Sequence, residues 1–204
     1  MKDIRIAAVI SNSPMGDIGG NLDAVWRWVK IAKAGGARMV CFPEMNVTGY
    51  SSQNAVRDLA QPVPGPISEE LSRISASEKV VVMAGMAESG RQGEIFASHL
   101  VLLPGQRPQI YRKLHVAPPE EHVFSPGNHV PIFTACGLTF GNQLCYDAHF
   151  PELTTCMAAR GADLIFMPHA SPRGSAIQKH TSWLRHLPAR AFDNSLFVVA
   201  CNQS

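Results

Sequence analysis

Short apolar segments rich in β-forming residues alternate with amphipathic helical segments along most of this chain. Apolar runs at 5–10 and 38–42 flank a segment, 20–34, whose apolar residues recur at helical spacing. Alternating strands and helices of this kind predict an α/β protein with a partly parallel sheet. Consecutive strands predicted at 79–87 and 94–103, joined by a Gly-containing turn, add antiparallel pairing.

The turn and cap residues predict where several elements begin and end. The first helix is predicted to be capped by Gly20 or Asn21 and to stop at Gly35 and Gly36. Residues 51–66 are predicted to form a loop, and Pro66 is predicted to open a second helix. Later strands are predicted at about 130–135, 137–144, 163–167 and 196–201, and helices at 150–160 and about 177–194.

Composition excludes several classes of protein. With 46% hydrophobic and 17% charged residues, the 204 residues are enough for one domain, 1–204, with a substantial core. The net charge of +2, without a basic segment that carries aromatic residues, argues against a nucleic-acid partner, and no apolar run is long enough to span a membrane. The five cysteines form no C-x-x-C pair, which argues against a disulfide framework and predicts a reducing, cytoplasmic location.

Three reactive side chains directly follow apolar strands, and strand ends are where α/β enzymes place such groups. They are Glu44, Lys113 and Cys145. Cys145 also lies shortly before Pro151, a favoured first residue of a helix. A helix N-terminus near a cysteine is expected to lower the pKa of the thiol and to provide N–H groups for an oxyanion. The other four cysteines are predicted to be core residues.

The segments around these residues resemble the nitrilase, or carbon-nitrogen hydrolase, superfamily. The resemblance rests on FPEMNVTGY (42–50), YRKLH (111–115) and GNQLCYD (141–147), with FPE at 150–152. The segments SPG (125–127) and RAFDN (190–194) also look like family landmarks. The order and spacing of these motifs fit the family's Glu-Lys-Cys triad, and the resemblance covers essentially the whole chain.

The resemblance implies a four-layer α-β-β-α sandwich of two mixed sheets. It also implies a second glutamate that orients the lysine and substrate, for which Glu120 is favoured and Glu121 is the near competitor. Neither a metal nor another cofactor is expected, because the lysine supplies the fixed positive charge. We expect a homo-oligomer, and because family chains usually run well beyond 204 residues, we expect C-terminal strands and a tail beyond Ser204.

The residues after Cys145 favour an amide or carbamoyl substrate over a nitrile. True nitrilases usually follow the cysteine with Trp-Glu, whereas Tyr-Asp looks more like the amidase and carbamoylase branches. The residues expected to contact this small molecule are Tyr50, Tyr146, His149, His169 and Arg173, whereas His115, His122, His129, His180 and His186 are expected to be solvated. None of the histidines forms an H-E-x-x-H metal motif.

Three alternatives stay open. Nitrile hydrolysis would use the same cysteine. A non-catalytic member or fragment would keep the triad without turning over an amide. A thiol redox protein is less favoured, because Cys145 has no resolving cysteine at short spacing and Glu44 and Lys113 would have no role.

Overall fold

The computed structural model describes residues 3–171 and 174–204 and contains two β-sheets. In the first sheet the strands follow the order β1-β2-β3-β4-β5; β1, β2 and β3 are parallel, whereas β4 is antiparallel to both of its neighbours. Their bounds are β1 Ile6–Ala8, β2 Met39–Cys41, β3 Val81–Ser89, β4 Ile95–Leu102 and β5 Gln109–Arg112. The predicted combination of parallel and antiparallel pairing is therefore present within one sheet.

The second sheet has the order β6-β7-β8-β9. Strand β6 is antiparallel to β7, and β7, β8 and β9 are parallel. Their bounds are β6 Phe133–Ala135, β7 Leu138–Asn142, β8 Leu164–Pro168 and β9 Phe197–Cys201. Both sheets are mixed, as the resemblance implied.

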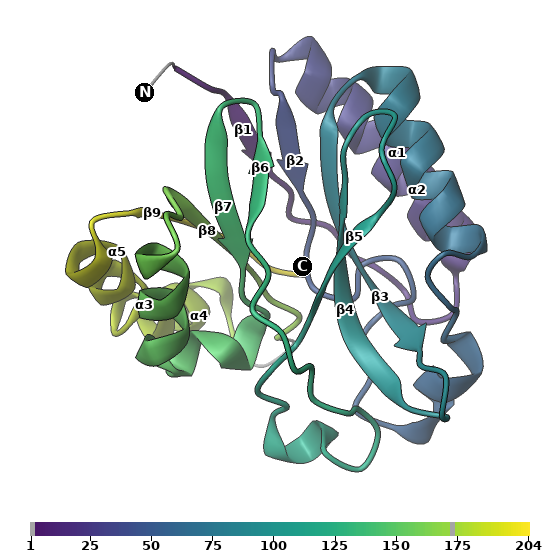
Figure 1. The fold of residues 1–204 in the computed structure, drawn as a ribbon. Helices are drawn as coiled ribbons and strands as arrows, with labels where there is room; N and C mark the ends of the chain where they lie inside the picture. Colours follow the sequence, from purple (N-terminus) through teal and green to yellow (C-terminus); the bar gives the residue numbers. More distant parts are fainter. Residues whose placement is uncertain (1–2, 172–173) are drawn as a thin grey trace.

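Helices cover the outer faces of the two sheets (Figure 1). Helices α1 and α2 lie against the first sheet, and α3, α4 and α5 lie beside the second. Their bounds are α1 Ile18–Ala34, α2 Pro66–Glu78, α3 Pro151–Ala159, α4 Ala176–Leu184 and α5 Leu187–Asn194. One buried cluster includes Val29 of α1 and Leu71 of α2, between these helices and the first sheet. Another includes Tyr111 of β5 and Phe166 of β8, between the two sheets. The architecture is thus the α-β-β-α sandwich.

The first helix begins earlier than its sequence pattern predicted. Asp17 is the N-cap, and its carboxylate accepts a hydrogen bond from the Gly20 backbone N–H at 3.1 Å. The predicted cap at Gly20 or Asn21 was wrong, because two glycines inside a first turn look unfavourable for a helix although the Asp17 cap stabilises that turn. Asn21 is buried instead and donates from its side-chain amide to the carbonyls of Pro14 and Val47, both at 2.9 Å.

Two further segments differ from their predicted form. The predicted loop at 51–66 contains a 3-10 helix, Asn54–Leu59, and the helical region at 177–194 is divided into α4 and α5, with Pro188 in the first turn of α5. A proline has no N–H to donate and is therefore compatible with a helix start and not with a helix interior. Among the described residues, no helix combines the length and the hydrophobicity that crossing a membrane requires.

The cysteines are less uniform than expected. All five are free; Cys41 and Cys201 are buried, Cys136 is partly buried, and Cys156 is exposed on α3. The prediction that Cys156 is a core residue was wrong, because the residues that α3 buries are Leu153, Thr154 and Met157, on another side of the helix.

Candidate active site

Glu44 follows β2 and lies at the junction of the two sheets. Its side chain is 1% exposed; Oε1 contacts Lys113 at 2.8 Å and Oε2 accepts a hydrogen bond from the Ala170 backbone N–H, just after β8, at 3.1 Å. The turn that carries Glu44 packs closely on Gly85 of β3, where a Cβ atom would come within 2.3 Å of the Met45 nitrogen. A side chain at residue 85 would therefore displace the carboxylate.

Lys113 lies between two buried carboxylates. It follows β5, its side chain is 1% exposed, and its ammonium is 2.8 Å from Glu44 and 2.8 Å from Glu120. Glu120 belongs to the 3-10 helix η2, Pro118–Glu120, and accepts a hydrogen bond from the Tyr50 hydroxyl at 2.7 Å. Glu121 is exposed, so of the two predicted candidates it is Glu120 that faces the lysine.

The SPG segment holds the Lys113 backbone in place. The Gly127 N–H donates to the Lys113 carbonyl at 2.8 Å, and a Cβ atom on Gly127 would come within 2.6 Å of the Arg112 carbonyl oxygen. The glycine thus permits two backbone segments to approach closely beside the lysine.

Cys145 is the first residue of the 3-10 helix η3, Cys145–His149, which precedes α3. Its φ of 44° lies in the left-handed region, which is uncommon for a residue with a side chain. Strained backbone of this kind clusters at functional sites, where the surrounding contacts must maintain it.

Asp147 supplies those contacts. Its buried carboxylate accepts hydrogen bonds from the Leu144 N–H at 2.9 Å, the Tyr111 hydroxyl at 2.7 Å and the His115 N–H at 2.8 Å, and contacts the His115 ring at 2.9 Å. These bonds join the turn carrying Cys145 to β5 and to the segment that follows Lys113.

Burial dominates the acid-base properties of the site. It raises the pKa of the Glu44 carboxyl, although the Lys113 ammonium acts in the opposite direction. Burial alone would lower the pKa of Lys113, but the carboxylates of Glu44 and Glu120 outweigh it and hold that pKa above its usual value. At neutral pH the lysine is therefore a fixed cation.

The acidity predicted for Cys145 was wrong. Burial, followed by the charge of Glu44, raises the pKa of the Cys145 thiol to about 12, and Lys113 offsets only part of this. The helix that begins at residue 145 is a short 3-10 turn, whereas desolvation and a nearby carboxylate act directly on the sulfur. The thiol is therefore protonated at neutral pH and requires a base before it can attack.

The remaining predicted contact residues lie in different surroundings. Tyr50 is partly buried against Glu120, Tyr146 and His149 have ring centroids 5.3 Å apart, and Arg173 is outside the described residues. His169 is buried beside Trp183, with 4.8 Å between ring centroids, and neither of its ring nitrogens has a partner among the described residues.

The expectation that five other histidines are solvated was partly wrong. His122, His129 and His180 are exposed. His115 instead stacks on Phe150 with ring centroids 3.6 Å apart and bonds to Asp147, because the end of β5 and the Cys145 turn converge there. His186 is partly buried and stacks on His149 at 4.9 Å.

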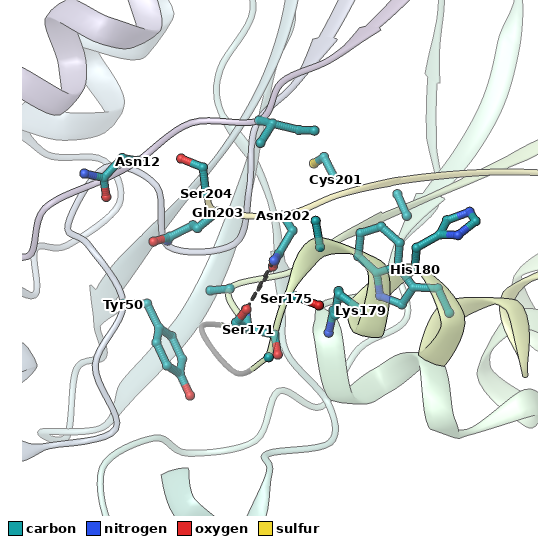
Figure 2. A pocket seen from close by; sticks show the side chains of 16 residues that line it. Asn12, Tyr50, Ser171, Ser175, Lys179, His180, Cys201, Asn202, Gln203 and Ser204 are labelled. Atoms are coloured by element: carbon teal, nitrogen blue, oxygen red, sulfur yellow. Dashed lines mark hydrogen bonds between the residues drawn. The ribbon is translucent and has the colours of Figure 1, made fainter.

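A cavity of about 600 Å³ adjoins residues that bond to Glu44 and Glu120. Figure 2 shows the side chains that line it. Tyr50 and Ala170, which bond to those two carboxylates, form part of its wall. Ser171, Lys179, Trp183 and residues 200–204 line other parts. Within residues 3–171 and 174–204, no group of three or more His, Cys, Asp or Glu side chains is arranged to hold a metal ion.

Sequence reasoning did not identify several residues of this region. Asp147 lies two residues after Cys145 in a quoted motif, and an acidic residue beside a nucleophile is a signal that could have found it. Lys179 and Trp183 carry no such signal, because only the packing of α4 places them in the cavity wall and brings the Lys179 charge close enough to act on the Cys145 thiol.

Comparison with known proteins gives a consistent picture. Residues 5–204 match the carbon-nitrogen hydrolase family. A hydrolase from Pseudomonas protegens is 30% identical, with 99% of this chain and 70% of the relative covered. An (R)-stereoselective amidase from a Pseudomonas species is 28% identical, with 83% and 60% covered. The structure of an amidase from Nesterenkonia superimposes with a TM-score of 0.86 at 25% identity, with 98% of this chain and 76% of that one covered.

Proposed function

Because this chain belongs to the carbon-nitrogen hydrolase family, we propose that it hydrolyses the C–N bond of a small amide or carbamoyl compound through a thioester on Cys145. One observation carries the proposal: the buried ammonium of Lys113 is held 2.8 Å from the carboxylates of both Glu44 and Glu120. The charges of all three groups act on the Cys145 thiol. Such a group of charges is costly to bury, and a neighbouring protonated thiol that requires a base gives it a chemical purpose.

The first step is proton transfer and attack. Glu44 takes the proton from the Cys145 thiol, and the sulfur forms a bond to the carbonyl carbon of the substrate. The electron pair of the C=O bond moves to the oxygen, and the Lys113 ammonium and the Tyr146 backbone N–H stabilise the oxyanion. Glu120 holds the lysine in position through its 2.8 Å contact.

The next steps release the two products. The oxyanion collapses, the C–N bond breaks, and protonated Glu44 gives its proton to the departing nitrogen, which leaves as ammonia or an amine. Water then attacks the thioester while Glu44 takes a water proton. The C–S bond breaks, the acid is released, and the proton returns to the Cys145 sulfur.

A substrate panel with a matched cysteine variant tests this function. Ammonia release is measured with small aliphatic amides, carbamoyl compounds and nitriles, using the natural chain and Cys145→Ala. Cys156→Ala, which changes an exposed cysteine on α3, is the control. We expect turnover of amides or carbamoyl compounds that Cys145→Ala abolishes and Cys156→Ala retains, with a mass increase on Cys145 when a slow substrate is used.

Two results would contradict the proposal. Release only from nitriles would assign the chain to nitrile hydrolysis. A relative from Pyrococcus abyssi that is 28% identical is named a nitrilase. An absence of turnover across the panel by a folded protein would favour the non-catalytic alternative.

A further inference from the structure

The turn that carries Glu44 interrupts the pairing of β2 with β3. The parallel ladder is regular as far as the Phe42 N–H, which donates to the Met83 carbonyl at 2.9 Å. In a regular ladder the Phe42 carbonyl would then accept the Gly85 N–H. The chain instead leaves the sheet, forms the turn, and rejoins β3 through the Val47 N–H, which donates to the Gly85 carbonyl at 2.9 Å. The Gly85 N–H therefore needs an acceptor from elsewhere.

Asn46 supplies that acceptor from within the turn. Its side-chain carbonyl oxygen, Oδ1, accepts a hydrogen bond from the Gly85 N–H at 2.8 Å, and the residue is only 2% exposed. Thr48 acts in the same way further along, where its hydroxyl oxygen accepts a hydrogen bond from the Ala87 N–H at 3.1 Å. A buried N–H without an acceptor is unfavourable, so these side-chain bonds determine where the turn can lie on β3. Asn46 is the nearer of the two to Glu44 in the chain.

The backbone between Glu44 and Asn46 is strained. Met45 has a φ of 58°, in the left-handed region that is uncommon for a residue with a side chain. Such a conformation persists only where the surrounding contacts maintain it. The bond from Asn46 to Gly85 fixes the chain immediately after Met45, so it is one of the contacts that hold this conformation.

We propose that Asn46 is a positioning residue for the general base: its bond to Gly85 fixes the turn that presents the Glu44 carboxylate to Lys113. This inference rests on the proposed function, in which Glu44 is the base. The two oxygens of that carboxylate are held 2.8 Å from the Lys113 ammonium and 3.1 Å from the Ala170 N–H, and a displacement of the turn by about 1 Å would misalign it for proton transfer.

Two substitutions of Asn46 and a distant control test the inference. Asn46→Leu keeps a similar shape but removes the acceptor, whereas Asn46→Asp keeps an oxygen in the same place. Ser75→Ala is the control, because Ser75 of α2 is buried and its hydroxyl bonds to the carbonyls of Val80 and Leu102 at 2.8 and 2.9 Å, away from the turn. Amide turnover is measured against pH for each variant, and each melting temperature is recorded.

The turn keeps other anchors in Asn46→Leu, so the variant should fold. The Val47 N–H still bonds to Gly85, and the Gln203 side-chain amide donates to the Glu44 carbonyl at 2.9 Å. The substitution should therefore shift the turn locally and leave the two sheets in place.

We expect Asn46→Leu to lower kcat at least about tenfold with a smaller change in KM. Its acid-side apparent pKa should also rise, because the Lys113 charge lowers the pKa of Glu44 and a looser contact weakens that effect. Asn46→Asp should recover most of kcat at the plateau of its own pH profile, and Ser75→Ala should keep kcat and the apparent pKa even if it melts earlier. An unchanged kcat in Asn46→Leu, or an equal loss in Ser75→Ala, would overturn the assignment.

Alkylation of Cys145 separates failure of this inference from failure of the proposed function. Iodoacetamide reacts without turnover: the sulfur forms a bond to the CH₂ carbon, iodide leaves, and Glu44 takes the thiol proton. The rate at pH 7 is followed by mass spectrometry of the Cys145 peptide in the full chain, Glu44→Gln and Asn46→Leu.

We expect both variants to be alkylated at least about tenfold more slowly than the full chain. If no amide is hydrolysed, the proposed function is contradicted for this class, yet slow alkylation in both variants would still support the role of Asn46. A rate in Asn46→Leu equal to that of the full chain would refute that role independently of turnover. An undiminished rate in Glu44→Gln would overturn the assignment of the base and, with it, this inference.

Discussion

Removing the buried ammonium of Lys113 should destabilise the protein in a way that depends strongly on pH. Lys113→Met keeps most of the side-chain volume and deletes the charge between Glu44 and Glu120. At 2.8 Å and an effective dielectric constant of about 20, each lost attraction corresponds to about 6 kcal/mol before solvation is considered. Two buried carboxylates would then repel each other without a cation between them.

Protonation of a carboxylate limits this cost. Neutralising one glutamate with a reference pKa of about 4.3 requires about 3.7 kcal/mol at pH 7 and about 1 kcal/mol at pH 5. The other carboxylate can remain charged, because Glu44 keeps the Ala170 N–H and Glu120 keeps the Tyr50 hydroxyl. We therefore expect Lys113→Met to lower the free energy of unfolding by about 4 kcal/mol at pH 7 and by about 1 kcal/mol at pH 5.

The direction follows from proton linkage. In the variant, the folded-state pKa of one glutamate is raised above its unfolded value, so the folded protein binds more protons. The stabilisation that protonation of this glutamate gives to the folded variant is complete below the unfolded-state pKa and is lost as the pH rises through the folded-state pKa. Relative to the natural chain, the variant should therefore become more stable as pH falls from 7 to 5.

Urea unfolding at both pH values measures these differences. The control combines Lys113→Met with Glu44→Gln and Glu120→Gln, which removes all three charges and should eliminate the pH dependence of the loss. A loss of less than about 1 kcal/mol at pH 7, or an equal loss at both pH values, would refute the assignment of a charged, mutually dependent triplet.

Three other measurements test the site. Burial raises the pKa of Glu44, and the carboxylates of Glu44 and Glu120 raise the pKa of Lys113. The value of kcat/KM for an amide should therefore rise with pH through an apparent pKa above 4.5 and show no alkaline fall below pH 10.5 while the protein stays folded; a fall near pH 8 would exclude Glu44 and Lys113 as the titrating pair. Asp147→Asn should cost about 1–3 kcal/mol of stability and lower turnover, since an amide leaves the N–H of either Leu144 or His115 without an acceptor; unchanged melting and turnover would contradict that role. Burial lowers the pKa of His99 to about 3, so the stability that the neutral imidazole contributes is present above pH 6.5 and is lost as the pH falls toward 3. His99→Gln should therefore reduce the slope of the unfolding free energy against pH on the acid side by up to about 1.4 kcal/mol per pH unit, and an identical slope would show that another group titrates.

Local patterns in the sequence were sufficient for most of the order of strands and helices, although they did not separate α4 from α5. Apolar runs of β-forming residues and helical periodicity are local properties, and they located every strand of the second sheet to within a few residues. Glu44, Lys113 and Cys145 were singled out because each follows such a run. The boundaries that were wrong, such as the start of α1, depended on which polar side chain caps the helix in three dimensions.

The sequence by itself determined which residues could take part in chemistry, and the tertiary structure decided their environment. Glu120 and Glu121 are adjacent in the chain, but only the fold places one of them 2.8 Å from Lys113 and exposes the other. The pKa of Cys145 likewise depends on desolvation and on charges from residues 44, 113 and 179. Periodicity and caps act over a few residues, whereas burial and Coulomb interactions act between segments that are distant in the chain, which is why only the folded structure revealed the protonated thiol and the lysine beside the cavity.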